Sequence, residues 1–392
     1  MPGRDIDPSN GLHGGDWSAH LAPRAAAAQQ TGGGRGVSEA ADDSIVVDTT
    51  TRIFKDLADP LELNKAKDES WKAPLWQALE EAGLPLAWVP DELGGSGASI
   101  GDGFDVLRVA GRSATPVPLA ETLIAGWLLA RAGIAAPAGI MTVAPVTLEG
   151  GLTLGTGNAV NGVAMGVPFA SEAGHIVAVA GSGKRSSVAL LEAKRARISK
   201  GQSLAGDAKC EVAFENASAV AVGELETAVG ASPVALIGAA ARAMQMAGAL
   251  ESALEMATAY AKERIAFERK IGQFQAVQHN LAKLAGETAA ALAVAGSAAD
   301  TLAAQSALDD SVFLEVASAK IRVGEAAGAG AAIAHQVHGA IGFTLEHALQ
   351  RLTRRLWAWR DEFGTESEWA VLLGNKIAAE GADQLWPTIA AR

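Results

Sequence analysis

The stretch AWRDEFGTESEW, residues 358–369, holds side chains that could remove a proton from a substrate. Glu362 precedes the aromatic Phe363, and a Gly-Thr pair that ends at Thr365 follows. A carboxylate in an apolar pocket has a raised pKa, which suits it to take a proton from carbon. This stretch is therefore the first place to look for a general base.

A second set of residues could bind a diphosphate. Arg264 stands at the end of an expected helix, and Gly339 lies in the turn-like segment HGAIGF. A guanidinium forms charge-assisted hydrogen bonds with phosphate, and a glycine turn lets the backbone approach it closely. Two structural alternatives stay open: Arg264 could pair with Glu263 or Glu268, and Gly339 could only end a helix.

Two further groups are interpreted as structural. A set of histidines and one glutamate lies close together in the chain without a zinc-ligand spacing, and we expect no metal there: His335, His338, Glu346 and His347. The single cysteine, Cys210, lies in the alternating segment AKCEVAFENAS and is expected to be a buried thiol in a strand.

The elements that position these residues follow from hydrophobic period and turn residues. The pattern predicts an α+β protein with an N-terminal all-helical domain at 44–136 and a small β-barrel or β-sandwich domain at 137–228. A C-terminal four-helix bundle is expected at 229–392, and residues 1–43 are expected to be a disordered or low-complexity extension. Within the first domain, Ser70 is expected to cap a helix that ends at Gly83.

Composition limits the possible partners. The 392-residue chain has 49% hydrophobic residues and a formal net charge of -12, which argues against nucleic acid and anionic membranes as partners. The 44 glycines and many alanines favour helices that cross closely. No apolar run forms a clean membrane span, since ASPVALIGAAARAMQMAGAL carries Arg242, so a soluble, cytoplasmic protein is expected.

Two stretches resemble the acyl-CoA dehydrogenase family. The first is YAKERIAFERKIGQFQAVQHNLAKLA, with family-type residues at Arg264, Phe267, Ile271, Gly272, Phe274, Gln275, Gln278, Leu281 and Ala282. The second is AHQVHGAIGFTLEHALQRLTRR, and the resemblance extends over residues 50–385. It implies an acyl-CoA substrate, FAD as cofactor, an electron-transfer flavoprotein as acceptor, and a dimer or a dimer of dimers.

The resemblance also implies residue roles. Arg264 and Phe267, with Ile271 and Phe274, are expected to contact FAD across a subunit interface. On the partner subunit, Gln336 and the Gly339-Ala340 turn match positions that meet its ADP part, and Thr365 can meet FAD as well. Phe169, in the segment Val167-Pro168-Phe169 typical of a divergent bacterial branch, lies against the flavin or simply in the core.

Several positions depart from the family pattern. Glu268 stands where the family usually has glycine, and Ala340 replaces the second glycine of its turn. The usual position of the catalytic base holds Phe363, and the position used by a second group of members holds Gly238, followed by Ala239. Both usual base positions therefore lack a carboxylate.

Three explanations are open for the missing base. Glu362 could serve after a one-residue shift, although we favour a solvated partner of Arg360 or Arg355 for it. The chain could be the base-free subunit of a heteromeric dehydrogenase, which is the explanation we prefer. It could also be a homo-oligomer with another flavin chemistry, or a scaffold. The basic segment RLTRRLWAWR is interpreted as an interface or a neighbour of a CoA phosphate, through Arg351, Arg354 or Arg355.

Overall fold

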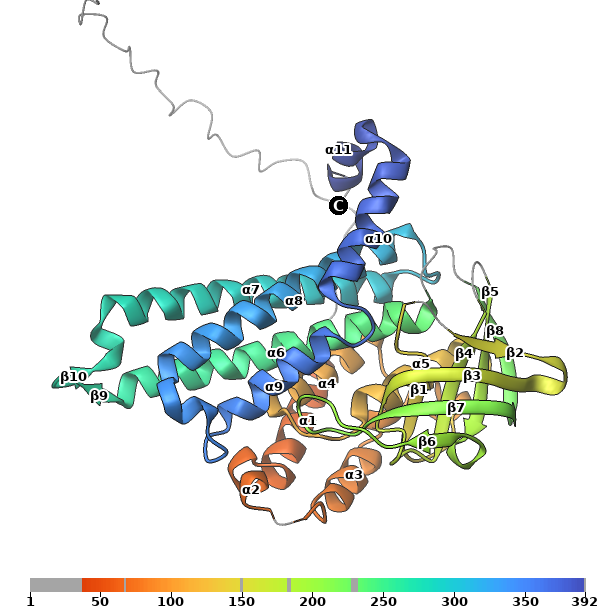
Figure 1. The fold of residues 1–392 in the computed structure, drawn as a ribbon, viewed down its shortest axis with the longest axis horizontal. Coiled ribbons are helices and arrows are strands. Elements are labelled where there is room, and N and C mark those ends of the chain that lie inside the picture. Colours follow the sequence, from red (N-terminus) through yellow and green to blue (C-terminus); the bar gives the residue numbers. More distant parts are fainter. Residues whose placement is uncertain (1–36, 67, 149–150, 182–184, 227–231, 391–392) are drawn as a thin grey trace, which may run out of the picture. The chain divides into compact units, whose positions relative to one another are not determined.

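The N-terminal part consists of helices, as the sequence predicts (Figure 1). The computed structural model describes residues 37–66, 68–148, 151–181, 185–226 and 232–390. The helices are α1 (Val37–Leu57), α2 (Pro60–Lys65), α3 (Lys72–Glu81), α4 (Ile100–Ser113) and α5 (Leu119–Arg131), with 3-10 turns η2 (Leu84–Leu86) and η3 (Asp91–Leu93). α1 begins inside the segment predicted as an extension, and residues 43–392 form one compact unit.

The helix ends in this part follow local capping chemistry, with one correction. Ser99 caps α4 in a capping box with Asp102. Ser70 does not cap α3, because the helix starts later, with Trp71 at the N-cap, and the Ser70 amide instead donates to Asp68 in a turn. The end at Gly83 was predicted correctly, since Gly83 follows α3 with a φ of +70°.

The middle part is built from two four-stranded sheets. One has the order β1-β4-β5-β8 and the other β2-β3-β7-β6. The strands are β1 (Met141–Ala144), β2 (Leu152–Leu154), β3 (Ala159–Pro168), β4 (His175–Ala180), β5 (Arg185–Glu192), β6 (Arg197–Ser199), β7 (Lys209–Ser218) and β8 (Ala221–Glu226), with turns η4 (Thr156–Asn158) and η5 (Ala193–Arg195). β1 and β4 pair in parallel, and the other pairs within these two sheets are antiparallel.

The two sheets share an apolar core, which makes this part a β-sandwich. Val160 and Phe214 from one sheet belong to the same buried cluster as Ile176 and Leu191 from the other. Cys210 is buried in β7 within this cluster, so its predicted structural place is confirmed.

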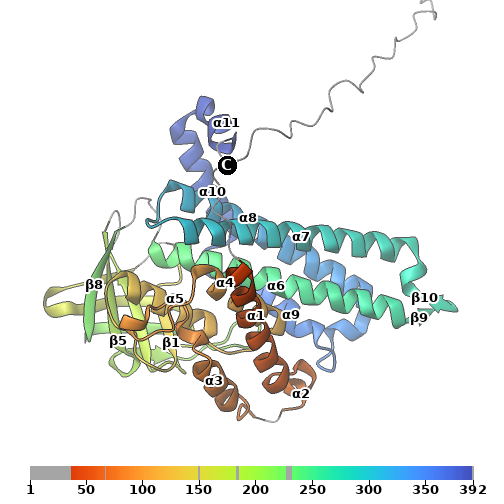
Figure 2. The same cartoon turned by 180° about the vertical axis from the view of Figure 1, so that it is seen from behind.

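The C-terminal part is a bundle of long helices (Figures 1 and 2). It contains α6 (Pro233–Glu263), α7 (Gln275–Ala304), α8 (Asp310–His338) and α9 (Leu349–Arg360), separated by β9 (Ile265–Ala266), β10 (Arg269–Lys270), η6 (Ile271–Gln273) and η7 (Gly339–Phe343). Two more helices follow that the sequence reasoning missed, α10 (Glu366–Glu380) and α11 (Ala382–Ala390).

Helix α6 is the central element of the bundle. Its length and apolar composition would suffice to cross a membrane, but its most apolar window is entirely buried, as in the core helix of a globular protein. Glycines let α4 cross it closely: a Cβ atom on Gly111 would lie 2.1 Å from the Gln245 carbonyl oxygen, and one on Gly248 2.1 Å from that of Arg108. Small residues at helix crossings were expected from the composition.

Candidate functional site

The two usual base positions of the resemblance, Gly238 and Phe363, lie in direct contact. Phe363 is fully buried, and a Cβ atom built on Gly238 would lie 2.2 Å from its Cδ1 atom. The aromatic ring therefore fills the space that a side chain at position 238 would need. Counting along the chain identified both positions, and the structure shows that they form one packed contact.

The backbone after α9 places this ring through a left-handed turn. Phe363 and Gly364 have φ values of +55° and +90°. The Phe363 amide donates to the Val146 carbonyl at 3.1 Å, and the indole Nε1 of Trp369 donates to the Phe363 carbonyl at 2.8 Å. A Cβ atom at Gly364 would lie 2.7 Å from the same indole nitrogen, so glycine is required there.

Thr365 begins α10 in a capping box. Its hydroxyl accepts from the Glu368 amide at 3.2 Å and donates to the Glu368 carboxylate at 2.9 Å. The spacing Thr-x-x-Glu is a sequence signature of such a cap, and the sequence reasoning overlooked it. The predicted contact of Thr365 with a cofactor stays a prediction, and it would have to share the hydroxyl with this cap.

Glu362 lies in the core and binds Arg242 of α6. The Arg242 Nε donates to Glu362 Oε2 at 2.8 Å, and Nη2 lies 2.7 Å from the same oxygen. The side chains of Arg242 and Glu362 are 2% and 5% exposed, and Arg242 also binds Glu121 of α5. The expectation of a solvated Glu362 beside Arg360 or Arg355 is wrong, because the turn after α9 directs this side chain into the bundle.

The charges of this buried cluster compensate one another. Burial raises the pKa of Glu121, and Arg242 opposes that shift. Burial by itself lowers the pKa of Arg242, but Glu121 and Glu362 together raise it above its ordinary value. The guanidinium also lies over the Phe363 ring, with its central carbon 5.7 Å from the ring centroid. Glu362 is therefore one of two carboxylates that bind a buried guanidinium, which also donates to the side-chain oxygen of Gln245.

Lys320 of α8 fixes the end of α9 beside this cluster. It is fully buried, and its Nζ donates to the carbonyls of Trp359 and Arg360 at 3.0 and 2.7 Å. Burial lowers the pKa of Lys320 to about 7, against the opposing charge of Glu362. The lysine thus donates to two carbonyls in the last turn of α9, where the helix itself supplies few donors.

At the other end of α6, a two-residue hairpin exposes Phe267. β9 and β10 pair across Phe267 and Glu268, which have φ values of +53° and +65°. Both central residues of a type I′ turn need positive φ, so Glu268 occupies a backbone position that favours glycine. Phe267 is 89% exposed and meets Phe274 edge-on at 6.2 Å between ring centroids.

The remaining predicted cofactor residues of the bundle lie at the same end. Stacking of Tyr260 on His338, 4.7 Å apart, brings the ends of α6 and α8 together. The predicted cofactor residues at this end are exposed or half-buried: Arg264, Ile271, Phe274, Gln336, Gly339 and Ala340. Within the described residues Arg264 has no ion pair, neither with Glu263 nor with Glu268. An unpaired cation, an exposed ring and an exposed glycine at φ +66° suit an anionic nucleotide ligand.

Phe169 and Thr365 lie away from this group. Phe169 follows β3, is buried, and its amide donates to the Ala208 carbonyl at 2.9 Å. Gly238, on which Phe363 packs, and Arg264 are separated by roughly 40 Å along α6 at 1.5 Å per residue. In the described part of the chain, the Gly238–Phe363 contact and the predicted cofactor residues around Arg264 therefore lie at opposite ends of α6.

The histidines form an aromatic cluster rather than an open site. The ring of His335 stacks on Phe343 at 3.9 Å, and His338 lies 4.8 Å from His347. Burial lowers the pKa of all three imidazoles. Among the described residues no group of three or more His, Cys, Asp or Glu side chains could hold a metal ion.

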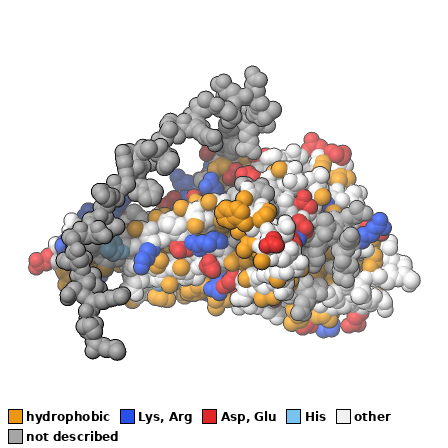
Figure 3. Space-filling view, turned by 90° about the horizontal axis from the view of Figure 1, so that it is seen from above, with side chains coloured by type: hydrophobic (Ala, Val, Ile, Leu, Met, Phe, Trp, Pro, Cys, Tyr) orange, Lys and Arg blue, Asp and Glu red, His pale blue; other side chains and the backbone are white. Residues whose placement is uncertain are grey.

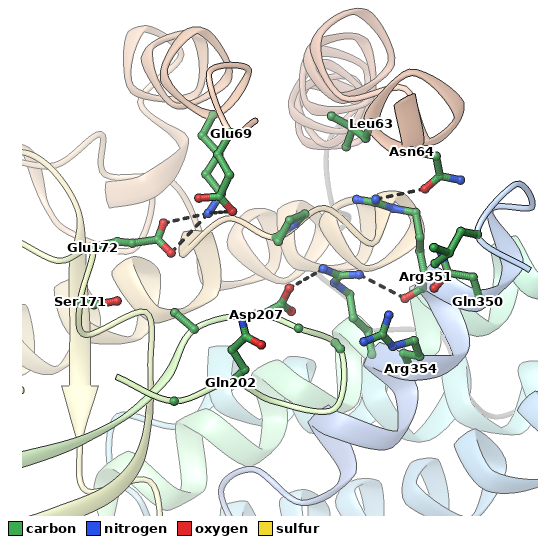
Figure 4. A pocket seen from close by; sticks show the side chains of 18 of the residues that line it. Leu63, Asn64, Glu69, Ser171, Glu172, Gln202, Asp207, Gln350, Arg351 and Arg354 are labelled. Atoms are coloured by element: carbon green, nitrogen blue, oxygen red, sulfur yellow. Dashed lines mark hydrogen bonds and ion pairs between the residues drawn. The ribbon is translucent and has the colours of Figure 1, made fainter. Parts of the chain in front are cut away.

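A cavity of about 670 Å³ opens between α2, α3, α9 and the β6–β7 connection (Figure 4). Arg355 of α9 crosses to Asp207 of the connection at 2.5 Å. Arg351 and Arg354 lie on the same helix at the cavity wall, and Glu172 lies across it. The three arginines singled out in the sequence thus meet in one cavity.

Sequence reasoning missed the buried cluster around Arg242. In the sequence Arg242 interrupts an apolar run, and the pattern does not indicate that Glu121 or Lys320 lies near it. A signal was available for Arg242 and Glu121: each is a lone charge inside a long apolar helical segment, and such a charge is buried only when it is paired. Lys320 carries no such signal, because Glu315, Arg322 and Glu325 lie near it on the same helix.

Comparison with known proteins agrees with this architecture. Residues 236–367 match the family model described as acyl-CoA dehydrogenase, C-terminal domain. The chain is 29% identical over 292 residues to the acyl-CoA dehydrogenase IpdE2 of Mycobacterium tuberculosis, which covers 74% of this chain and 82% of that protein.

Solved structures share the fold. A chain of the ChsE4-ChsE5 complex from Mycobacterium tuberculosis matches with a TM-score of 0.73 and 24% identity, covering 86% of this chain and 97% of that one. A variant of the steroid ACAD Tcur3481-Tcur3483 matches with a TM-score of 0.75 and 24% identity, covering 88% and 99%. With its helical domain, β-sandwich and bundle in this order, the chain has the fold of these acyl-CoA dehydrogenases, and its bundle is similar to the C-terminal domain of that family.

Proposed function

We propose that the chain is the base-free subunit of a heteromeric, FAD-dependent acyl-CoA dehydrogenase. The observation that carries the proposal is the contact of Phe363 with Gly238. Either position could have supplied a carboxylate, and both lack one while the ring fills the space between them. Glu362, the nearest acidic residue in the chain, is bound to Arg242 in the core.

The reaction requires a carboxylate that removes the α-proton of an acyl-CoA thioester. FAD, when bound, supplies the acceptor for the hydride that leaves the β-carbon. In this proposal the residues of this chain bind and orient the cofactor: Arg264 pairs with the diphosphate, Phe267 packs on a flat ring, and the Gly339 turn approaches phosphate. The proton acceptor comes from another chain.

The exposed surface supports an assembly with a second subunit. Phe267, Phe343 and Leu345 are 89%, 65% and 72% exposed at one end of the bundle. Hydrophobic side chains also gather in the middle of the face seen in Figure 3, over α10 and α11. Val371, Leu385, Trp386 and Ile389 are exposed on these helices. Apolar residues exposed in groups are typical of subunit interfaces.

The comparisons favour a related acyl-CoA dehydrogenase subunit as the partner. Two of the similar structures carry paired names, ChsE4-ChsE5 and Tcur3481-Tcur3483, and the second is called a steroid ACAD. We infer that the acyl group belongs to a fatty acid or a steroid side chain, that the electrons pass to an electron-transfer flavoprotein, and that the enzyme works in the cytoplasm.

Expression alone and with a partner tests the proposal. The chain is produced alone and together with the family member encoded beside it, and FAD is measured by absorbance per chain. Acyl-CoA oxidation is followed with an artificial acceptor. We expect activity only from the co-expressed pair. Full turnover by the lone chain would refute the proposal, and loss of that turnover in Glu362→Gln would identify a shifted base.

A further inference from the structure

The cavity beside α9 contains cations that no carboxylate of the described residues neutralises. Its acidic residues are already paired: Asp207 with Arg355 at 2.5 Å, and both Glu69 and Glu172 with Lys72, at 2.9 and 3.1 Å. Among the described residues, the lining cations without a carboxylate within 4 Å are Lys200, Arg351 and Arg354. The whole chain has a net charge of -12, whereas the lining of this cavity holds five cations and three carboxylates.

Arg351 is the most constrained of the three. It is half-buried, its one side-chain hydrogen bond runs from Nη1 to Asn64 at 3.3 Å, and its Nε is buried without a partner. Burial and the neighbouring Arg355 lower the pKa of Arg351 to about 10. Asp207 opposes this shift, but no carboxylate of the described residues lies within ion-pair distance of the Arg351 guanidinium.

The other two cations, Arg354 and Lys200, line the same cavity, and most of their hydrogen-bond donors are available to a ligand. Arg354 donates from Nε to the Leu204 carbonyl at 2.9 Å, which leaves its terminal nitrogens available. Lys200 is exposed at the start of the β6–β7 connection. Figure 4 shows the basic residues of α9 on one side of the cavity and Glu69 and Glu172 on the other.

We propose that Arg351, Arg354 and Lys200 bind a phosphate group of a nucleotide ligand in this cavity. Guanidinium groups match phosphate through paired hydrogen bonds, and a cavity of about 670 Å³ has the size of small-molecule sites. The carboxylates on the opposite wall can accept hydrogen bonds from ribose hydroxyls or an amino group.

The site is separate from the residues that the family resemblance assigns to FAD. None of Phe169, Arg264, Phe267, Gln336, Gly339 or Thr365 lines this cavity. The choice of ligands to test rests on the proposed function, because both CoA and FAD carry phosphate esters. The arrangement of the cations favours a phosphate group, and experiment decides whether CoA or FAD supplies it.

Equilibrium binding to the full chain tests this site without requiring turnover. CoA, FAD and sodium pyrophosphate are titrated by calorimetry against the wild type and the variants Arg351→Gln, Arg354→Gln and Lys200→Gln. Arg185→Gln, an exposed arginine on β5 outside the cavity, is the control for the same change in net charge. Thermal unfolding confirms that each variant is folded, and Lys200 is exposed enough that its substitution leaves the core intact.

We expect each cavity variant to weaken binding of at least one of the three compounds by about tenfold, and Arg185→Gln to leave it unchanged. Weaker CoA binding with unchanged FAD binding assigns the site to CoA, and the reverse assigns it to FAD. Equal affinities in the wild type and all cavity variants, or no binding of any compound at millimolar concentration, would overturn the proposal. Binding without turnover in any preparation would retain this site and reject the proposed function.

Discussion

The two ends of α6 differ in burial and in the pairing of their charges. At the first end, Gly238 packs under the buried ring of Phe363, and Arg242 binds two carboxylates out of contact with water. At the other end, Phe267 projects from a hairpin with 89% of its surface exposed, and Arg264 has no ion pair among the described residues. At the first end, which we call the closed end, the buried charges are paired and Phe363 fills the space beside Gly238. At the second, the open end, Arg264 and Phe267 remain accessible.

The two ends therefore differ in which groups a substrate or a cofactor can reach. A proton acceptor must be reached by substrate, and the closed end offers none that is free of a buried partner. A cofactor-binding group must be accessible to a ligand or a second subunit, and the open end meets that need. Substitutions at the closed end should therefore change stability, and substitutions at the open end should change binding.

The largest effect is expected when the buried cation is removed. Arg242→Met leaves Glu121 and Glu362 in the core without a partner, and we expect a loss of about 3–5 kcal/mol in the free energy of unfolding. Urea denaturation measures it. Arg112→Met is the control, because its pairs with Glu251 and Glu255 are partly exposed and should contribute about 0–1 kcal/mol. Equal losses in both variants would show that the buried ion pairs of Arg242 contribute no more to stability than the partly exposed pairs of Arg112.

A methyl group at position 238 should disturb the closed end next. Gly238→Ala places a carbon into the Phe363 ring, and overpacking of this kind costs about 1–3 kcal/mol of stability. Combination with Phe363→Leu should recover part of the loss, with a coupling energy of about 1 kcal/mol or more in a double-mutant cycle. Strict additivity of the two changes would contradict the contact.

The pH dependence of stability should reveal the lowered pKa of the buried Lys320. Its folded-state pKa of about 7 lies below the ordinary value of 10.5, so between these limits the unfolded chain binds more protons than the folded chain. The free energy of unfolding should therefore rise with pH, by up to about 1.4 kcal/mol per unit above pH 7 from this group. Denaturation at pH 7, 8 and 9 should show a smaller slope for Lys320→Met than for the wild type, and equal slopes would count against this assignment.

The smallest effect on stability is expected at the open end. Phe267→Ala removes an exposed ring, so the free energy of unfolding should change by no more than about 0.5 kcal/mol. FAD content of the co-expressed assembly should nevertheless fall, because the ring is proposed to contact the cofactor. Wild-type FAD content in this variant would remove Phe267 from the site.

The fold and the candidate residues were predictable to different extents. Helical periods, strand alternation and Gly or Pro at the ends predicted the order of domains, because these signals are local. The empty base positions at Gly238 and Phe363 followed from counting along the chain. The contact between them, and the pairing of Glu362 with Arg242, join residues far apart in sequence, and no local pattern carries that information.

The exposure of Glu362 was mispredicted for a physical reason. Helix α9 ends at Arg360 and Phe363 takes a left-handed conformation, so the direction of the Glu362 side chain does not follow from the helical pattern of the sequence before it. The strain at Glu268 was visible only in part: the absence of the usual glycine was noted, but the positive φ that makes glycine favourable there needed the structure.

The central claim is that this chain supplies no proton acceptor, and anaerobic flavin reduction tests it most directly. The co-expressed assembly is mixed with its acyl-CoA substrate, and bleaching of the flavin absorbance is followed before and after the partner's catalytic carboxylate is replaced by an amide. We predict that bleaching disappears in that variant, and that Glu362→Gln in this chain leaves the rate per bound flavin unchanged. Bleaching that persists without the partner's carboxylate and is lost with Glu362→Gln would contradict the account.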